Sequence, residues 1–323
     1  MSPIDVSGRM YKMDPIDRLI IERLKINCRT SLQNLSKISG FSANAVRKRI
    51  DSLEASGVIH SYTVWLSPLM TNEDSVIAIL EFETDQLEKK LIKNLSSNPS
   101  VSKVSRLLDG RYIVFGVCFD SEELSSLTMH LRTLPGISNV EMYSRFLHYW
   151  GGKIDFTSSH RDILRCLIRD PRMPISDVAK ETGLPSNEIK EIITQMRESE
   201  AVLFTINTSD VTNEESMEVL VKVQWNVGKT SNEHVLGWFQ EKFASSYLGE
   251  YVSATEPTLF FNFLVNHVQE VEIVVQKTKE SGLVSTIEPL ILFPGTSFPD
   301  PRLRRANQLL EETGFSSQNG PFA

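Results

Sequence analysis

The sequence predicts an α+β protein in which two small helical domains alternate with two βαββαβ, ferredoxin-like domains. Two observations lead to this prediction. The chain repeats its own pattern of apolar residues, and within each copy their spacing changes from helical to strand-like. A period near 3.6 residues is typical of amphipathic helices, and strict alternation is typical of half-buried strands.

The repeat has a register of 143 residues. Apolar residues and glycines superpose without a gap through three helical segments, namely Ile20 on Ile163, Leu24 on Leu167, Gly40 on Gly183, Val46 on Ile189 and Leu53 on Met196. The agreement continues into the strand-like segments 75–80 and 218–223. Such a long match indicates an internal duplication. Because a bare sheet face must be covered, we expect the two copies to pair inside one chain, as the subunits of a homodimer would.

The first helical domain has three helical patterns, Asp17–Leu24, Ser31–Ser39 and Ser42–Ala55, followed by an extended segment at 58–64. Gly40 lies where the second helix must stop and turn, and the serine two residues later is a good N-cap for the third. Three helices followed by a wing or connecting strand are typical of a winged helix-turn-helix, a DNA-binding domain.

Each helical domain is followed by a βαββαβ pattern, which forms an antiparallel sheet with helices on one face. The predicted segments are a disordered N-terminus (1–12), winged helix-turn-helix 1 (13–66), sheet domain 1 (67–150), winged helix-turn-helix 2 (151–208), sheet domain 2 (209–298) and a C-terminal helix and tail (299–323).

The composition is that of an ordinary soluble protein, with 41% hydrophobic and 23% charged residues. The sequence shows no apolar run of the roughly 18 residues that cross a bilayer, and its first residues do not resemble a secretory signal. Its three cysteines and six histidines lack the spacing of metal ligands, and none of the common nucleotide-binding or hydrolase motifs occurs. We therefore expect a cytoplasmic protein that is not an enzyme, with no catalytic residue, no cofactor, no metal and no membrane contact.

The charge is segregated along the chain. Residues 1–66 hold ten Lys/Arg and six Asp/Glu, a net charge of +4. Because the whole chain has a net charge of −7, the other 257 residues have a net charge of −11. The location of the cations, rather than their number, decides whether a domain can approach DNA. The basic N-terminal domain is therefore the candidate for nucleic-acid contact.

Helical projection of 42–55 places Val46, Ile50 and Leu53 on the buried side and Asn44, Arg47 and Lys48 on the opposite side. Asparagine suits adenine and arginine suits guanine in the major groove, while residues at the start of the preceding helix suit phosphate. The candidate DNA-binding residues are Arg29, Ser31, Lys37, Ser42, Asn44, Arg47, Lys48 and Arg49. Alternatively, the basic run 47–49 is only the solvated face of a small helical domain.

These residues resemble the Lrp/AsnC (feast/famine) transcription regulators from Asp14-x-x-Asp17 through Arg29 to Gly57-Val58-Ile59. The βαββαβ part resembles that family's effector-binding and oligomerisation (RAM) domain. The resemblance covers nearly the whole chain twice, so it implies a tandem-duplicated form, since ordinary members carry one copy. The implied partners are double-stranded DNA, a second copy in a homodimer or higher oligomer through the RAM-like sheets, and a small-molecule effector.

The second copy is not equivalent to the first. Where the first helix reads Lys48-Arg49, the second reads Glu191-Ile192. Segment 156–207 has seven Lys/Arg against eight Asp/Glu, a net charge of −1. Acids close to phosphate are repulsive, so we expect the second domain to be structural or a protein-contact surface.

In the resembling family, a glycine turn with the pattern G-D-x-D helps to hold the effector. This chain has Asp109-Gly110-Arg111, which keeps the glycine, but Arg111 and Ile113 replace the two acids. The candidate effector-binding residues are thus Asp109, Gly110 and Arg111, with an anion as the ligand that the arginine favours. A plain hairpin turn explains the Asp-Gly pair equally well.

Two other functions remain open. Fused chains of this kind also occur as sirohaem decarboxylases, which carry a His/Tyr/Arg-rich strand after the first helix of the sheet domain; segment 101–107 has neither His nor Tyr. An effector-sensing adaptor that binds another protein through the acidic half 156–323 is the third possibility.

Overall fold

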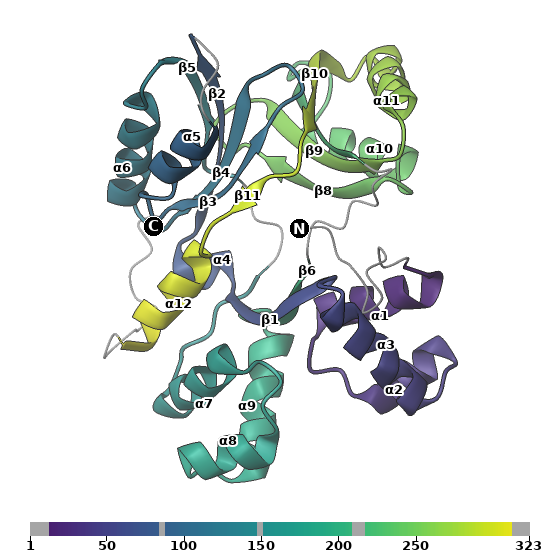
Figure 1. The fold of residues 1–323 in the computed structure, drawn as a ribbon, viewed down its shortest axis with the longest axis vertical. Helices are drawn as coiled ribbons and strands as arrows, with labels where there is room; N and C mark the ends of the chain where they lie inside the picture. The colour runs from purple at the N-terminus through teal and green to yellow at the C-terminus, as the bar shows by residue number, and fades with distance from the viewer. Residues whose placement is uncertain (1–12, 84–87, 147–150, 209–216, 312–323) are drawn as a thin grey trace. The chain divides into compact units, whose positions relative to one another are not determined.

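The computed structural model describes residues 13–83, 88–146, 151–208 and 217–311. The segment 1–12, predicted to be disordered, and the last part of the predicted tail, 312–323, lie outside the described residues. The chain divides into two compact units: 1–71, 150–211 and 302–323 form the first, and 72–149 and 212–301 form the second. Both helical domains therefore share one unit and both sheet domains share the other (Figure 1).

The first helical domain consists of α1 (Pro15–Ile26), α2 (Leu32–Ser39) and α3 (Ala43–Ala55). The side chains of Asp14, Ser31 and Ser42 cap these three helices by accepting backbone N–H groups. Gly40 ends α2 with a left-handed backbone (φ +75°), which glycine adopts without a steric penalty. The three predicted helices are confirmed; the second and third begin and end within one residue of the prediction, whereas the first is longer by two residues at each end than the predicted Asp17–Leu24.

The second helical domain repeats the first with α7 (Ser158–Arg169), α8 (Ile175–Thr182) and α9 (Ser186–Glu198). The helices of both domains have 12, 8 and 13 residues, in that order, and each lies 143 residues after its counterpart. The positions that cap α2 and α3 with serine hold Pro174 and Pro185 here, and proline has no side-chain acceptor. The duplication therefore holds in three dimensions, but the helix starts differ.

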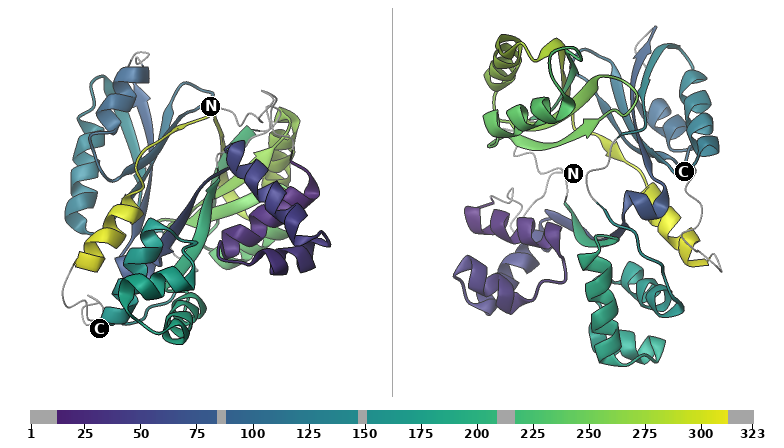
Figure 2. Two further views of the ribbon diagram at one scale, coloured as in Figure 1. Left: turned by 60° about the horizontal axis from the view of Figure 1, so that its bottom comes forward. Right: turned by 180° about the vertical axis from the view of Figure 1, so that it is seen from behind.

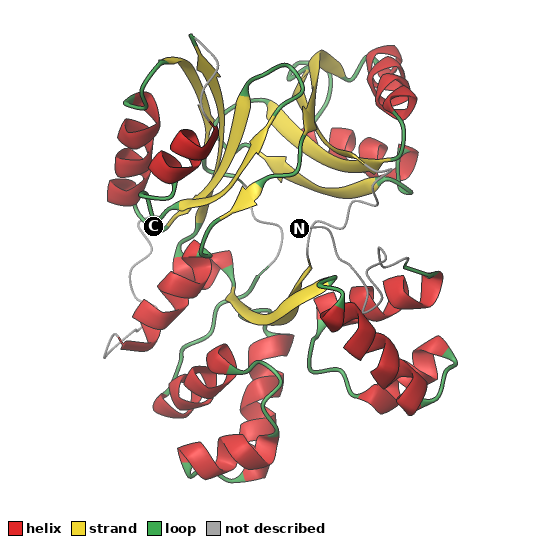
Figure 3. Ribbon diagram, viewed as in Figure 1, coloured by secondary structure: helices red, strands yellow, loops and turns green. Residues whose placement is uncertain are grey.

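The strand after each helical domain pairs with its counterpart in the other copy. β1 (Ile59–Leu66) and β6 (Val202–Thr208) form a two-stranded antiparallel ribbon that joins the two domains (Figure 3). One continuous hydrophobic core contains buried residues of both domains, such as Leu24, Val46, Leu164 and Phe204. A short helix, α4 (Pro68–Thr71), follows β1 and also contributes to this core. The two winged helices therefore form one body within the chain.

The second unit contains two βαββαβ domains, as predicted. Their elements are β2 (Asp74–Phe82), α5 (Glu88–Leu95), β3 (Val101–Arg106), β4 (Tyr112–Cys118), α6 (Ser121–Arg132) and β5 (Ile137–Tyr143), then β7 (Met217–Trp225), α10 (Asn232–Lys242), β8 (Tyr247–Val252), β9 (Thr258–Val265), α11 (Val268–Ser281) and β10 (Val284–Leu292). The strand orders are β3-β4-β2-β5 and β10-β7-β9-β8. The helices of each domain cover one face of their own sheet (Figure 2).

The other faces of the two sheets pack against each other. Val76 and Ala78 of β2 point to the helices, whereas Ile77 and Ile79 join a second core with Leu220 and Phe260 of the other copy. Both faces of β2 are thus buried, which its nearly continuous apolar sequence requires. The two copies pair inside the chain as predicted. An oligomer through the sheets would have to use their edges or helices, because the facing surfaces are already covered.

The C-terminal segment crosses from the second copy to the first. β11 (Thr296–Ser297) adds a fifth strand next to β3. Gly295 enters this pairing so closely that an added Cβ would lie 2.2 Å from Ser105 Oγ and 2.6 Å from the Val104 carbonyl oxygen. The chain then forms α12 (Pro301–Glu311), whose Ala306, Leu309 and Leu310 are buried in the core of the winged-helix unit.

Candidate nucleic-acid interface

Helix α3 presents a polar edge that no described element covers. Val46, Ile50 and Leu53 are buried at 0–3% exposure, while the side chains on the opposite side, Asn44, Arg47 and Lys48, are exposed. The projection from the sequence is therefore confirmed for this helix. Three neighbouring donors on one exposed helix edge can enter a major groove and bind base edges.

The starts of α2 and α3 add groups that suit phosphate. The hydroxyls of Ser31 and Ser42 accept the backbone N–H groups of Asn34 and Ala45 at 3.2 Å each, and both serines are exposed. A hydroxyl that accepts one bond can still donate another, and a helix N-terminus attracts anions. Lys37, in the last turn of α2, is also exposed. Six of the eight candidate residues thus lie where a duplex could reach them.

Arg49 is not placed as predicted. Its Nη1 donates to Asp14 Oδ2 at 2.7 Å and to Asp17 Oδ1 at 2.8 Å, and its guanidinium lies 5.3 Å from the centre of the Phe41 ring. The Asp17 N–H and Arg49 together hold the pKa of Asp14 below its usual range. Arg49 therefore ties α3 to α1, and its guanidinium is engaged within the domain.

Arg29 also has a different role from the one predicted. It donates from Nη1 to the carbonyl oxygen of Pro171 at 2.6 Å and from Nη2 to that of Met173 at 2.9 Å. Both acceptors belong to the second copy, in the loop before α8. This half-buried arginine joins the two winged helices rather than facing a phosphate. The sequence could not show this, because the acceptors are backbone atoms more than 140 residues away.

A hollow of about 280 Å³ between α1 and α2 escaped the sequence analysis. Its lining includes Ile26 and Ile38, which are 63% and 46% exposed. The equivalent positions of the second copy hold Arg169 and Glu181, which form an ion pair. Comparison of the two copies could have pointed to this hollow, because isoleucines at positions 26 and 38 correspond to charged residues in the second copy.

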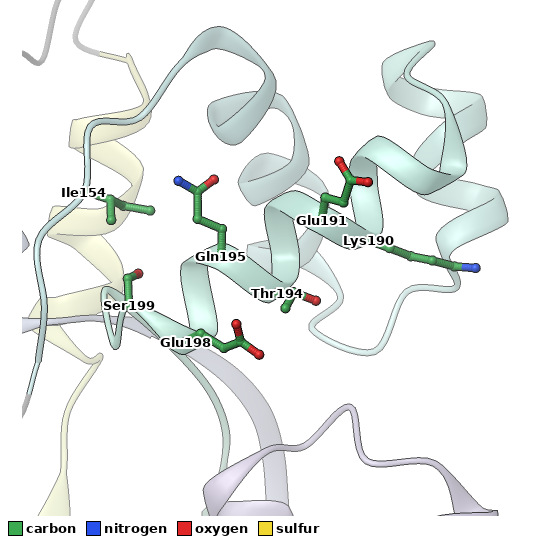
Figure 4. A pocket seen from close by; sticks show the side chains of 7 residues that line it. All are labelled: Ile154, Lys190, Glu191, Thr194, Gln195, Glu198 and Ser199. Carbon is green, nitrogen blue, oxygen red and sulfur yellow. The ribbon is translucent and has the colours of Figure 1, made fainter.

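The second copy presents a different surface on α9. Lys190, Glu191, Thr194 and Glu198 line an open hollow of about 550 Å³ together with Ile154 (Figure 4). Position 191 is acidic where α3 has Lys48, and the two helix caps are prolines rather than serines. The second winged helix therefore lacks the cap hydroxyls and one of the three exposed donors of the first.

The candidate effector turn is closed by the chain's own carboxylates. Arg111 donates to Asp109 at 2.6 and 2.9 Å and to Glu288 at 2.7 Å. Burial opposes ionisation of Asp109, but the hydrogen bonds and charge of Arg111 outweigh it and lower the pKa of Asp109. Lys222 joins the same network through Glu141 at 2.7 Å and Glu288 at 3.1 Å. Internal acids thus already pair with Arg111, so the structure adds no support to the predicted anion contact, and Gly110 (φ +93°) lies in the turn between β3 and β4.

Among the described residues, no group of three or more His, Cys, Asp or Glu side chains could hold a metal ion. In the same part of the chain, no helix is both long and apolar enough to span a bilayer.

Comparisons with known proteins agree with the geometry. An AsnC-type helix-turn-helix domain matches residues 13–54, and a winged helix-turn-helix DNA-binding domain matches residues 157–202. The HTH-type transcriptional regulator LrpA of Pyrococcus abyssi is 39% identical over 56 residues, which are 17% of this chain and 40% of that protein. The HTH-type transcriptional regulator FL11 of Pyrococcus horikoshii is 26% identical over 129 residues, 40% of this chain and 85% of that protein.

Over most of its length, the chain is similar in structure to a solved siroheme decarboxylase, NirDL. The TM-score is 0.57 at 13% identity, covering 92% of this chain and 98% of the other. At this identity, the likeness shows a shared fold of two winged helices and two sheet domains.

Proposed function

Because the chain is a tandem-duplicated relative of the Lrp/AsnC transcription regulators, we propose that it is a sequence-specific DNA-binding regulator that acts in the cytoplasm. The observation that carries the proposal is the exposed edge of α3, where Asn44, Arg47 and Lys48 follow a serine-capped helix start.

Each group has a distinct task in this proposal. Arg47 and Asn44 bind base edges, guanine and adenine being their preferred partners. Ser31, Lys37 and Ser42 bind phosphate and set the register of the domain on the duplex, and Lys48 can serve either purpose. Arg49 and Arg29 are not part of the interface, because both are engaged inside the protein.

One chain supplies one basic reading head in this scheme. A symmetric operator would then need two chains, with half-sites separated by about 34 Å or a multiple of it. The contact between chains would use surfaces other than the paired sheet faces, which are buried within each chain. An effector, if one acts on the sheet domains, would likewise bind away from Arg111.

The test is selection of DNA fragments from a random duplex pool by the purified full chain, followed by titration of the enriched sequence at several salt concentrations. We expect one sequence to be enriched and log affinity to fall linearly with log salt. Failure to enrich any sequence, or a salt slope near zero, would falsify the proposal.

The shared fold with NirDL makes a sirohaem-decarboxylating enzyme the second candidate. The sequence favours the regulator, because strand segment 101–107 has no His or Tyr. Absorbance titration of the purified chain with sirohaem separates the two functions, since the regulator is expected to leave the sirohaem spectrum unchanged.

A further inference from the structure

Arg29 and Arg172 occupy the same position in the two copies, 143 residues apart, and each reaches into the other copy. Arg29 binds the carbonyl oxygens of Pro171 and Met173, on either side of Arg172. Arg172 in turn donates to the Tyr62 hydroxyl of the first copy at 2.8 Å. Arg29 of the first winged helix therefore binds the loop of the second winged helix that carries Arg172, and Arg172 binds the first winged helix in return.

Arg172 is seated against Tyr62 by two interactions. Besides the hydrogen bond, its guanidinium lies 4.9 Å from the centre of the Tyr62 ring, in cation–π geometry. The Asp170 carboxylate accepts the backbone N–H of Arg172 at 2.9 Å and shapes the loop. The direction of the Arg172 side chain is thus set from both ends.

Tyr62 also contacts α3, the helix that carries the proposed DNA-reading side chains. Its hydroxyl donates to Glu54 Oε1 at 2.5 Å, and Glu54 lies in the last turn of α3. Burial and the Glu54 hydrogen bond both raise the pKa of Tyr62, so the hydroxyl keeps its proton and remains a donor. A continuous path of side chains therefore runs from the second winged helix to the end of α3.

Among the described residues, the equivalent positions form no such path to α9. The positions equivalent to Glu54 and Tyr62 are Arg197 and Thr205. Arg197 pairs with its neighbour Glu198, and Thr205 donates to the carbonyl oxygen of Lys25 instead of supporting α9. The two copies have thus diverged at the supporting positions as well as at the reading ones.

We propose that the second winged helix is a positioning partner for the first, and that Arg172, acting through Tyr62 and Glu54, fixes the orientation of α3 for base recognition. This inference rests on the proposed function. Base-edge hydrogen bonds need a helix held in one orientation, whereas phosphate contacts tolerate small rotations. Arg172 should therefore affect discrimination between DNA sequences more than general attraction to DNA.

The experiment compares the full chain with Arg172→Ala and Tyr62→Phe on two duplexes, the selected sequence and a scrambled one. Arg169→Ala is the matched control, because that arginine lies on the same domain in an exposed pair with Glu181. We expect Arg172→Ala to weaken binding to the selected duplex about tenfold and binding to the scrambled duplex less than about twofold. Tyr62→Phe, which keeps the ring and loses the hydroxyl, should show a smaller selective loss.

The salt dependence separates positioning from direct contact. Arg172→Ala should keep the salt slope of the unmodified chain, since no phosphate contact is removed. Equal losses on both duplexes, a reduced slope, or unchanged affinity for the selected duplex would each overturn the proposal.

A measurement without DNA distinguishes failure of this inference from failure of the proposed function. Hydrogen exchange of the unbound chain should become faster in 52–64 in Arg172→Ala and Tyr62→Phe but not in Arg169→Ala. If exchange there is unchanged, the coupling is absent whatever the chain binds. If exchange responds but the unmodified chain selects no DNA, the coupling stands and the regulator assignment fails.

Discussion

Arg49 binds Asp17 at 2.8 Å, and this pair fixes the reading helix to the first helix of its own domain. Only 3% of the Asp17 side chain is exposed, against 27% of Arg49, so the acid depends on this partner more than the arginine does. Position 49 therefore serves the stability of α3, while its neighbours at 47 and 48 face outward.

Arg49→Ala should lower the free energy of unfolding by about 2–3 kcal/mol, because a buried carboxylate then loses its cation. Arg47→Ala, on the exposed edge, should change it by less than about 0.5 kcal/mol. Urea denaturation of both variants checks this. An equal decrease in the free energy of unfolding in the two variants would show that the Arg49–Asp17 pair does not stabilise the domain.

Arg47→Ala combined with Lys48→Ala should reduce affinity for the selected duplex by about 2 kcal/mol or more, since base-edge contacts are lost. Lys190→Ala, at the position equivalent to Arg47, should leave it unchanged. Gel-shift titrations of the three proteins measure the difference. Comparable losses would mean that both winged helices touch DNA.

Lys37→Ala should weaken binding to selected and scrambled duplexes alike and reduce the salt slope by about one unit, as expected for one lost phosphate contact. Lys180→Ala is the control, because it changes the same position of the repeat and its lysine pairs with Asp177 at 3.1 Å. A slope that stays constant in Lys37→Ala would place this lysine outside the interface.

Because His160 is buried, we expect the stability of the second winged helix to depend on pH. It is 5% exposed, with Thr157 Oγ1 at 2.7 Å from Nδ1, and burial lowers its pKa below the usual 6.5. The unfolded chain therefore binds the proton first, so stability is complete above about pH 6.5 and falls as the pH decreases towards the folded pKa.

The slope from one such group is at most about 1.4 kcal/mol per pH unit. His160→Gln should remove it between pH 7 and 5, while the same change at the exposed His234 should leave it in place. Denaturation curves at each pH provide the measurement. If His160→Gln instead loses more stability per pH unit than the unmodified chain, folding raises the pKa of His160 rather than lowering it.

Gly295→Ala should cost about 1–3 kcal/mol, because the added methyl would overlap Ser105 Oγ and a backbone carbonyl. Gly228→Ala is a matched change, since nothing lies within 4 Å of a Cβ there. Thermal unfolding gives the cost, and hydrogen exchange at Phe298, whose N–H binds the Ser102 carbonyl at 2.9 Å, shows whether β11 detaches. If Gly295→Ala changes neither the thermal stability nor the exchange at Phe298, β11 can shift to accommodate the methyl group at no cost.

The helices and strands could be predicted because their signals are local, and the duplication because the two copies can be compared position by position. A cap such as Ser42, a stop such as Gly40 and a 3.6-residue period act within one turn of the chain. The projection of α3 likewise identified the exposed edge, since it depends only on helix geometry.

The errors concern long-range partners. Projection places Arg49 beside the buried stripe, but it does not reveal that the carboxylates of α1 lie there. Arg29 binds backbone carbonyls, which leave no trace in the sequence. The β1–β6 ribbon and the addition of β11 to the first sheet were also not predicted, because strand pairing between distant segments is set by the tertiary fold.

Fusion of the two copies has a consequence for how the protein can evolve. In an assembly of identical subunits, every substitution appears on both sides of the symmetry axis. Here Lys48 corresponds to Glu191 and Glu54 to Arg197, differences that a single chain can carry because its two halves have separate sequences. Peptide linkage also makes the encounter of the halves independent of protein concentration, so each half stays next to the other however dilute the protein is.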